Sequence, residues 1–226
     1  MTTNYASYWN EYEGDALTKV GGEPELEEYL QSRFCLSAGL REKDNFLDYG
    51  CGCLRGTIGL IRYLQEGHFH GCDISEKLLA AGDLRIVNRY GGDMGAKLKP
   101  ISDFDLSYIW KKKFDFILSV SLVTHILESD IRACFRGVRD VLADDGRWFF
   151  TIYPIWETEE REFGGDIGVM FYKRSFLKKI GEEVGLDIVD YGEDLKENPV
   201  KSNQFLTHVN SGLGQWVMVA RKSYNA

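Results

Sequence analysis

Strand-like and helix-like segments alternate along most of this chain, and that alternation limits the possible folds more than any other feature. Seven segments have the short apolar pattern of strands: 45–50, 69–73, 97–101, 114–120, 148–153, 186–192 and 215–221. Helical periodicity lies in the segments around 24–38, 55–65, 75–79, 131–142 and 176–184. The alternation predicts a doubly wound, Rossmann-like α/β fold, with a mostly parallel seven-stranded sheet and helices on both faces. Because only a polar loop separates the last two strands, we expect one of them to run antiparallel at the sheet edge.

The length and the lack of an interdomain linker favour one domain. The chain has 226 residues, within the usual size of a single domain. No internal repeat or low-complexity tract divides it. We therefore predict a single domain over 1–226, with residues 1–44 as an N-terminal helical cap region.

The net charge and the distribution of apolar residues limit which partners the protein can bind and where in the cell it is expected. There are 35 acidic and 27 basic side chains, which gives a net charge of −8. A general nucleic-acid binder needs a positive surface, so we expect no nucleic-acid partner. The chain has no apolar run of about 20 residues, and it begins without the basic and apolar regions of a signal peptide. We expect no membrane association and a cytoplasmic location.

The five cysteines do not form a recognisable framework of disulfides or metal ligands. They are Cys35, Cys51, Cys53, Cys72 and Cys134. Structural zinc sites usually combine C-x2-C pairs with a second pair or with histidines, and this spacing is absent. We predict five reduced thiols and no metal site.

A glycine-rich turn follows the first predicted strand, in Asp48-Tyr49-Gly50-Cys51-Gly52. Ligands of open α/β sheets bind at the carboxyl ends of the strands, so this turn lies where a site is expected. Gly50 and Gly52 allow the backbone to turn tightly and to approach a ligand. The third glycine of a dinucleotide fingerprint is replaced by Arg55. Asp48 adds a carboxylate that opposes a pyrophosphate and suits a ligand with a nearby cation.

A second acidic residue, Asp73, ends the second predicted strand. A carboxylate at this place accepts hydrogen bonds from ribose hydroxyls. Together with the turn, it indicates a ligand that has a ribose beside a cationic group and lacks a pyrophosphate. S-adenosylmethionine (SAM) meets this description.

These two motifs resemble those of the class I SAM-dependent methyltransferases, and the resemblance extends over nearly the whole chain. The D/E-x-G-x-G motif of that family matches residues 48–52, and its acid at the end of strand two matches Asp73. Where the family often has a third glycine, this chain has Leu54. The resemblance implies that SAM is the cofactor and S-adenosylhomocysteine (SAH) its product.

The resemblance also implies which residues hold the cofactor. Asp48, Gly50 and Gly52 would line the methionine moiety, Asp73 would hold the ribose, and Ile74 would pack on the adenine. The remaining cofactor residues implied by the resemblance are Cys51, Leu54 and Arg55 in the turn, Asp103 after strand three, and Ser119 at the end of strand four. Asp103 and Asp105 both fit the acid that meets the adenine amino group, and we choose Asp103 because it comes first after the strand.

The segment after the fourth strand supplies a candidate catalytic residue. Residues 119–125 resemble the S-V-x-x-x-T-H segment found in a subset of these enzymes, many of which act on sugars or secondary metabolites. An alcohol acceptor has to lose a proton, and an imidazole suits that task. His125 is the candidate general base. The alternative is that His125 caps or packs against the start of the following helix.

Residues 154–172, after the fifth strand, combine aromatic side chains with acidic ones and are predicted to form a lid over the acceptor. The preferred function is methyl transfer from SAM to a small molecule, with oxygen ahead of nitrogen as the acceptor atom. The acidic residues of the lid keep a small-molecule N-methyltransferase open as an alternative. From other classes, a nicotinamide-dependent oxidoreductase and a SAM-binding module without catalysis are the competing hypotheses.

Overall fold

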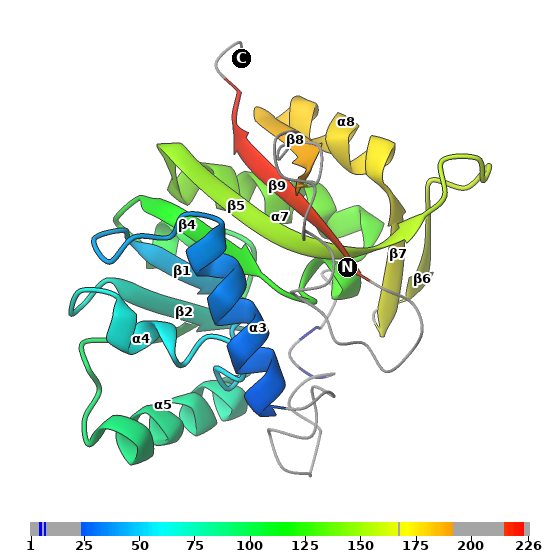
Figure 1. Cartoon of the computed structure of the whole chain (residues 1–226). Helices are drawn as coiled ribbons and strands as arrows, with labels where there is room; N and C mark the ends of the chain where they lie inside the picture. Colours follow the sequence, from blue (N-terminus) through cyan, green and yellow to red (C-terminus); the bar gives the residue numbers. More distant parts are fainter. Residues whose placement is uncertain (1–4, 6, 8–23, 167, 192–214, 224–226) are drawn as a thin grey trace. The chain divides into compact units, whose positions relative to one another are not determined.

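The computed structural model describes residues 5, 7, 24–166, 168–191 and 215–223. The chain divides into two compact units, residues 1–103 and 104–226 (Figure 1). A single domain over 1–226 remains a prediction. Residues 1–4, 6 and 8–23 of the region 1–44, which is expected to be an N-terminal helical cap, lie outside the described residues. The helix α3 (Pro24–Ser37) is the one expected towards the end of that region.

The first unit contains three parallel strands in the order β3-β2-β1. They are β1 (Phe46–Tyr49), β2 (Phe69–Asp73) and β3 (Lys97–Pro100). Every residue of β1 and β2 is buried, whereas β3 is largely exposed. Continuous burial on both faces is typical of inner parallel strands.

The helices of the first unit are α3, α4 (Leu60–Tyr63) and α5 (Glu76–Tyr90). The Ser75 hydroxyl accepts the backbone N–H of Leu78 at 3.3 Å, so the predicted N-cap of α5 is confirmed. The helix expected over 55–65 is wrong for most of its length. Turns occupy the segment up to Gly59, and only one helical turn, α4, follows.

The second unit contains the other six strands. They are β4 (Phe114–Ser119), β5 (Leu142–Ile155), β6 (Phe163–Asp166), β7 (Val169–Lys173), β8 (Leu186–Asp190) and β9 (Trp216–Lys222). Strand β5 pairs in parallel with β4 and, through its last residues, with β7. It also pairs antiparallel with β9, which in turn pairs antiparallel with β8. The expected antiparallel strand is thus β9, and it lies between β5 and β8 rather than at the edge.

Two of the nine strands in the described part of the chain were not among the seven expected. Strands β6 and β7 form an antiparallel hairpin that overlaps the segment 154–172, which is predicted to be a lid, and extends one residue beyond it. In β7 the side chains alternate, with Met170 and Tyr172 buried. The glycines Gly164 and Gly165 in β6 concealed the strand pattern, because glycine is disfavoured in strand interiors.

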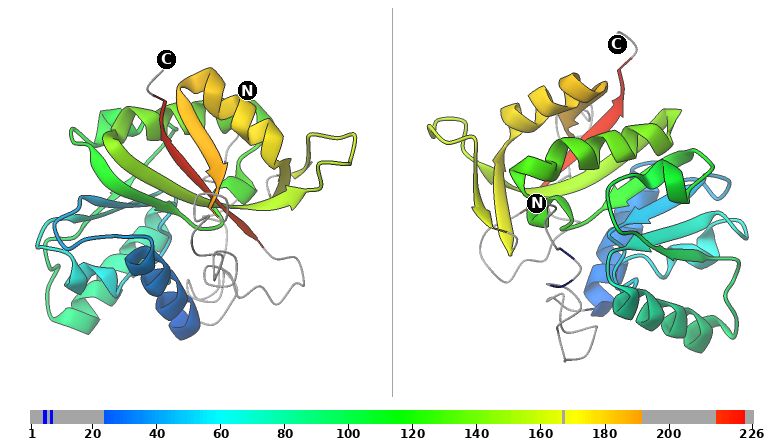
Figure 2. Two further views of the ribbon diagram at one scale, coloured as in Figure 1. Left: turned by 45° about the horizontal axis from the view of Figure 1, so that its top comes forward. Right: turned by 180° about the vertical axis from the view of Figure 1, so that it is seen from behind.

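Two long helices cover one face of the strands in the second unit. They are α7 (Glu128–Val141) and α8 (Arg174–Val184), which contact each other (Figure 2). The short helices α6 (Leu106–Ile109) and η1 (Val123–His125) precede α7. Phe135 of α7 packs edge-to-face against Trp148 of β5, with ring centroids 5.0 Å apart, at the centre of this core. No helix within the described ranges is both long enough and apolar enough to cross a membrane.

Candidate active site

The turn after β1 has an unusual backbone. Gly50, Gly52 and Leu54 all have positive φ angles, of 81°, 50° and 60°. The N–H groups of Gly50 and Cys51 donate to the carbonyl of Cys72 at 2.8 and 3.1 Å. Glycine takes this conformation at little cost, but for Leu54 it is strained, and the leucine side chain is fully buried. The departure from a third glycine therefore keeps the left-handed turn and adds a core side chain.

Asp73 is in direct contact with this turn. One carboxylate oxygen accepts the Gly52 N–H at 2.8 Å, and the other accepts the Ser75 N–H at 2.9 Å. Each carboxylate oxygen can accept a second hydrogen bond. The structure thus brings together the two motifs that the sequence singled out, at the carboxyl ends of neighbouring strands.

Asp48 is buried beneath the turn, and its carboxylate is hydrogen-bonded by the Thr57 hydroxyl at 2.5 Å. Burial raises the pKa of Asp48 to about 7. The hydrogen bond from Thr57 lowers that pKa, and the nearby charge of Asp73 raises it. A cationic group beside Asp48 would favour its ionised form.

Thr57 was not predicted as a site residue, and neither was Gln31. A methyl group added at Gly56 would lie 1.8 Å from the Gln31 side-chain oxygen, so α3 packs closely on the glycine turn. Gln31 in turn donates to Glu27 at 3.0 Å. The signal that could have found Thr57 is its spacing, because it is the first hydroxyl residue after the turn.

Arg55, the residue that interrupts the dinucleotide fingerprint, is partly buried in this unit. Burial lowers the pKa of its guanidinium, and the nearby carboxylate of Glu27 raises it. The guanidinium is thus compensated by a buried acid of α3, as buried charges generally require.

All five cysteines are buried free thiols. Burial raises the pKa of Cys35 and of Cys51 well above the usual value, with a smaller contribution from the negative charge of Asp48. The thiols beside the turn are therefore held in the protonated form. Within the described part of the chain, no three histidine, cysteine, aspartate or glutamate side chains are grouped so that they could hold a metal ion.

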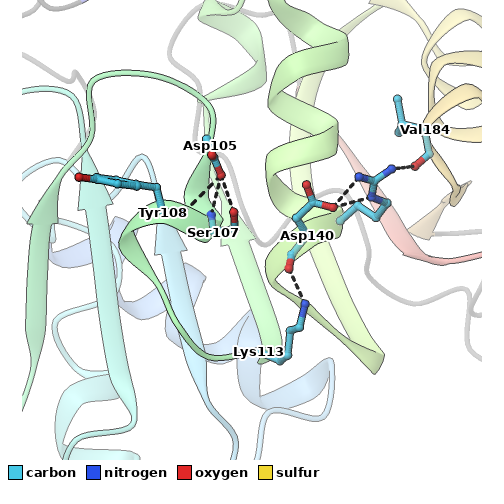
Figure 3. Close-up of polar contacts among 7 residues, drawn as sticks. Asp105, Ser107, Tyr108, Lys113, Asp140 and Val184 are labelled. Carbon is cyan, nitrogen blue, oxygen red and sulfur yellow. Dashed lines mark hydrogen bonds and ion pairs between the residues drawn. The ribbon is translucent and has the colours of Figure 1, made fainter.

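The two candidate acids after β3 have different surroundings. Asp105 is the N-cap of α6: its carboxylate accepts the Ser107 hydroxyl at 2.6 Å and the backbone N–H groups of Ser107 and Tyr108 at 3.1 and 3.3 Å (Figure 3). Asp103 is exposed just after β3, and Ile74 is half-buried at the end of β2. Because Asp105 has a capping role, Asp103 remains the preferred candidate for the adenine.

The predicted residues of the second unit lie at the end of β4 and just beyond it. The Ser119 hydroxyl accepts the indole N–H of Trp148 at 3.0 Å and is fully buried, so its side chain has a structural contact. His125 is half-buried and is the last residue of η1. The N-cap residue of α7 is Leu127, two residues after His125.

The acidic residues of the segment 154–172 include two with local contacts. Glu157 accepts the backbone N–H of Ser175 at 3.1 Å and also the Ser175 hydroxyl, both at the start of α8. Glu159 pairs with Arg161 at 2.9 Å. These contacts favour a structural and solvated role for both glutamates over the recruitment of an amine.

Comparisons with known proteins give one match to a family model and many matches to solved structures. Residues 47–148 match the model of a methyltransferase domain. Comparison with curated protein sequences gives no match.

Solved structures share the fold. Magnesium protoporphyrin IX methyltransferase from Synechocystis PCC 6803, with bound SAH, has a TM-score of 0.67 and 15% identity, over 96% of this chain and 98% of that one. A TehB-like SAM-dependent methyltransferase from Corynebacterium glutamicum has a TM-score of 0.58 and 21% identity, over 97% of both chains. A third neighbour, 1,6-didemethyltoxoflavin-N1-methyltransferase from Burkholderia thailandensis, has a TM-score of 0.63 and 16% identity, over 89% of this chain and 80% of that one. The fold expected from the sequence is confirmed.

Proposed function

Because residues 47–148 match the model of a methyltransferase domain and solved methyltransferases share the fold, we propose that this protein transfers the methyl group of SAM to a hydroxyl group of a small molecule. SAM is the methyl donor, and SAH is the second product. Neighbours of the same fold contain bound SAM or SAH, which supports this cofactor. The acceptor is proposed to be a sugar or a secondary metabolite.

The observation that carries the proposal is the contact between the glycine turn and Asp73. The Gly52 N–H donates to the Asp73 carboxylate at 2.8 Å, which holds the carboxylate at the end of β2, where an acid that accepts ribose hydroxyls is expected. The turn offers backbone instead of side chains at Gly50 and Gly52, so a ligand can approach it closely. This donor and acceptor set suits a nucleoside with a short charged substituent.

The residues around Asp48 fit the charge of the methionine portion. The Asp48 carboxylate has a pKa of about 7 and accepts a hydrogen bond from Thr57. When bound, SAM supplies a sulfonium that makes its methyl group electrophilic. A cationic group near Asp48 would favour the ionised carboxylate, and the ionised carboxylate would in turn stabilise the bound cation.

His125 is proposed to accept the proton of the acceptor hydroxyl. Methyl transfer needs the acceptor oxygen in line with the methyl carbon, so positioning supplies much of the rate. An imidazole can take up the proton of a hydroxyl group and release it to solvent afterwards. His125 lies in a short helix directly after β4, half-exposed.

An amine acceptor is the alternative, since neighbours with this fold include N-methyltransferases. Contacts of the acidic side chains Glu157 and Glu159 with their own surroundings give it less support here. Labelled-methyl SAM, incubated with the protein and a small-molecule extract, would distinguish the two by mass spectrometry of the product. An oxygen-bound label supports the proposal, and a nitrogen-bound label contradicts the acceptor assignment.

Cofactor binding is tested by calorimetry with SAH and NAD in parallel. We expect SAH to bind and NAD not to bind. Asp73→Ala should weaken SAH binding by at least tenfold, because a ribose hydrogen bond to a charged acceptor contributes about 1.5–3 kcal/mol. Asp93→Ala, in an exposed turn of the same unit, is the matched control. Unchanged SAH affinity in Asp73→Ala would refute the assignment of the ribose site.

The base role is tested with His125→Ala. Loss of a general base typically lowers kcat by about 10²–10⁴-fold. The expected loss should be smaller at high pH, where the acceptor ionises without help. A wild-type rate in His125→Ala would eliminate the base and leave a mechanism by positioning alone.

A further inference from the structure

The backbone at Ser121, two residues after β4, is strained. Its φ angle is +58°, and within the described ranges the only other non-glycine residues with positive φ are Leu54 and Met94. This conformation costs an L-residue about 1–2 kcal/mol. Such a residue keeps its conformation only when its surroundings hold it there, and strained residues of this kind concentrate at functional sites.

Hydrogen bonds to three residues hold every polar group of Ser121. Its N–H donates to the Thr151 hydroxyl at 2.7 Å, and its own hydroxyl accepts from the Gln215 amide at 2.9 Å. Its carbonyl accepts from the Thr124 hydroxyl at 2.8 Å. The three partners are each at most 5% exposed, so none of these bonds is easily replaced by water.

The partners come from different parts of the second unit. Thr151 lies on β5, opposite Val217 of β9, and Gln215 directly precedes β9. The strands β4, β5 and β9 lie side by side in Figures 1 and 2, and their pairing places both partners beside the end of β4. The turn is therefore held by the sheet itself.

The far end of the same loop is also anchored. The buried Tyr172 of β7 donates its hydroxyl to the carbonyl of Ile126 at 2.6 Å. His125 thus lies between two fixed points, Ser121 and Ile126, within the three-residue helix η1. A 3₁₀ helix of this length has weak internal hydrogen bonds and does not hold a side chain in place on its own.

We infer that Ser121, Thr151 and Gln215 form a clamp that positions His125 for proton transfer, and that Gln215 is a positioning residue of the reaction. The inference rests on the proposed function, in which His125 is the base. A displacement of a catalytic group by about 1 Å can cost about 10²-fold in rate. The clamp fixes where the chain leaves β4 and so determines the place of the imidazole.

Removing the Thr151 hydroxyl tests the backbone bond of the clamp. Thr151→Val keeps the shape of the side chain and leaves the Ser121 N–H without its acceptor. We expect kcat to fall by about 10–100-fold, with the KM for SAM within about twofold of wild type. Thr151→Ser restores the hydroxyl and should recover most of the rate.

Two substitutions at Ser121 distinguish the effect of the backbone strain from the effect of the hydrogen bond to Gln215. Ser121→Ala keeps the strained backbone and removes the hydroxyl that binds Gln215. Ser121→Gly also removes the hydroxyl but relieves the strain, so its thermal stability should be the higher of the two. We expect both to lower kcat, and Ser121→Gly at least as much, because its backbone is freer. Rates that simply follow thermal stability would mean a structural role and would overturn the inference.

A control and a readout independent of activity complete the test. Tyr63→Phe removes a comparable hydroxyl-to-carbonyl bond, to Leu40 at 3.0 Å in the first unit, and should leave kcat unchanged. The pH titration of the His125 imidazole can be followed by NMR, since the chain has four histidines. We expect Thr151→Val to alter this titration and Tyr63→Phe to leave it unaltered.

The possible failures are distinguishable. If Thr151→Val and Ser121→Ala both keep wild-type kcat and an unaltered His125 titration, the clamp does not position His125, and the inference is overturned. If instead the titration changes while His125→Ala keeps the wild-type rate, the clamp is real and the proposed base is wrong.

Discussion

The buried carboxylate of Asp48 makes the stability of this protein depend on pH. Its pKa is about 7 in the folded chain, against 3.8 without burial. A carboxyl group whose pKa is raised on folding binds more protons in the native state than in the unfolded state between these two values. Its ionisation therefore removes stability as the pH rises from about 4 to about 7, by an amount of the order of 4 kcal/mol.

Asp48→Asn should remove this dependence. The amide has the same shape and can still accept the hydrogen bond from Thr57, and it carries no charge to desolvate. We expect the ligand-free variant to be close to wild type in stability at pH 4.5 and clearly more stable than wild type at pH 8. Urea unfolding at both pH values measures the difference. Asp93→Asn, in an exposed turn, is the control with the same change of charge, and a gain for Asp48→Asn that is equal at both pH values would contradict the burial argument.

The proximity of the candidate site residues in the first unit was predictable from the sequence, but the contacts that support the candidate residues were not. Asp48, Gly50, Gly52 and Asp73 stand at the ends of two strands, and the topology alone brings such ends together. Gln215 could not be connected with Ser121, because 94 residues separate them in the chain and only the pairing of β9 with β5 brings them into contact. Sequence spacing carries no trace of that contact.

The sequence predicted helices and strands correctly where the local hydrophobic pattern and the tertiary packing favour the same structure. β2 has the predicted bounds 69–73, and α7 buries the predicted face of Ile131, Phe135 and Val138. The segment 55–65 failed because local contacts compete with a helix there. Thr57 donates to Asp48, Gly56 lies tightly against Gln31, and the backbone that makes these contacts forms turns.

In helix α7, we predict that replacing a glycine by alanine lowers stability, although helix propensity alone predicts a gain. Replacing glycine by alanine in a helix interior usually stabilises by about 0.5–1 kcal/mol. A methyl group at Gly137 would lie 1.8 Å from the backbone carbonyl oxygen of Phe104, so the chain before α6 would have to move. We expect Gly137→Ala to destabilise by about 1–3 kcal/mol.

The matched control is Gly82→Ala in α5. There the nearest atom to an added methyl group is a flexible side-chain carbon of Leu98, at 3.2 Å. We expect a much smaller effect, measured as the change in the midpoint of urea unfolding. If Gly137→Ala were as stable as wild type, this would contradict the close contact between α7 and the backbone of Phe104.

At the scale of the whole molecule, cofactor binding should appear as a gain in thermal stability. A ligand that binds only the folded state at 100 times its Kd adds about 2.7 kcal/mol. For a chain of 226 residues, this corresponds to a rise in Tm of about 5–10 °C. We expect SAH to produce such a rise and NAD at the same concentration to produce none. A rise with NAD and none with SAH would favour the oxidoreductase hypothesis.

The burial of all five cysteines has a practical consequence for such measurements. Alkylating reagents react with thiolates. All five thiols are buried, and burial also raises the pKa of Cys35, Cys51 and Cys53, which disfavours the thiolate form. A cysteine introduced at an exposed position such as Tyr108 would therefore be the reactive one in the native protein. Fluorescent or spin labels could then be attached at chosen sites without first removing the natural cysteines, and the spacing between the two units could be measured directly in solution.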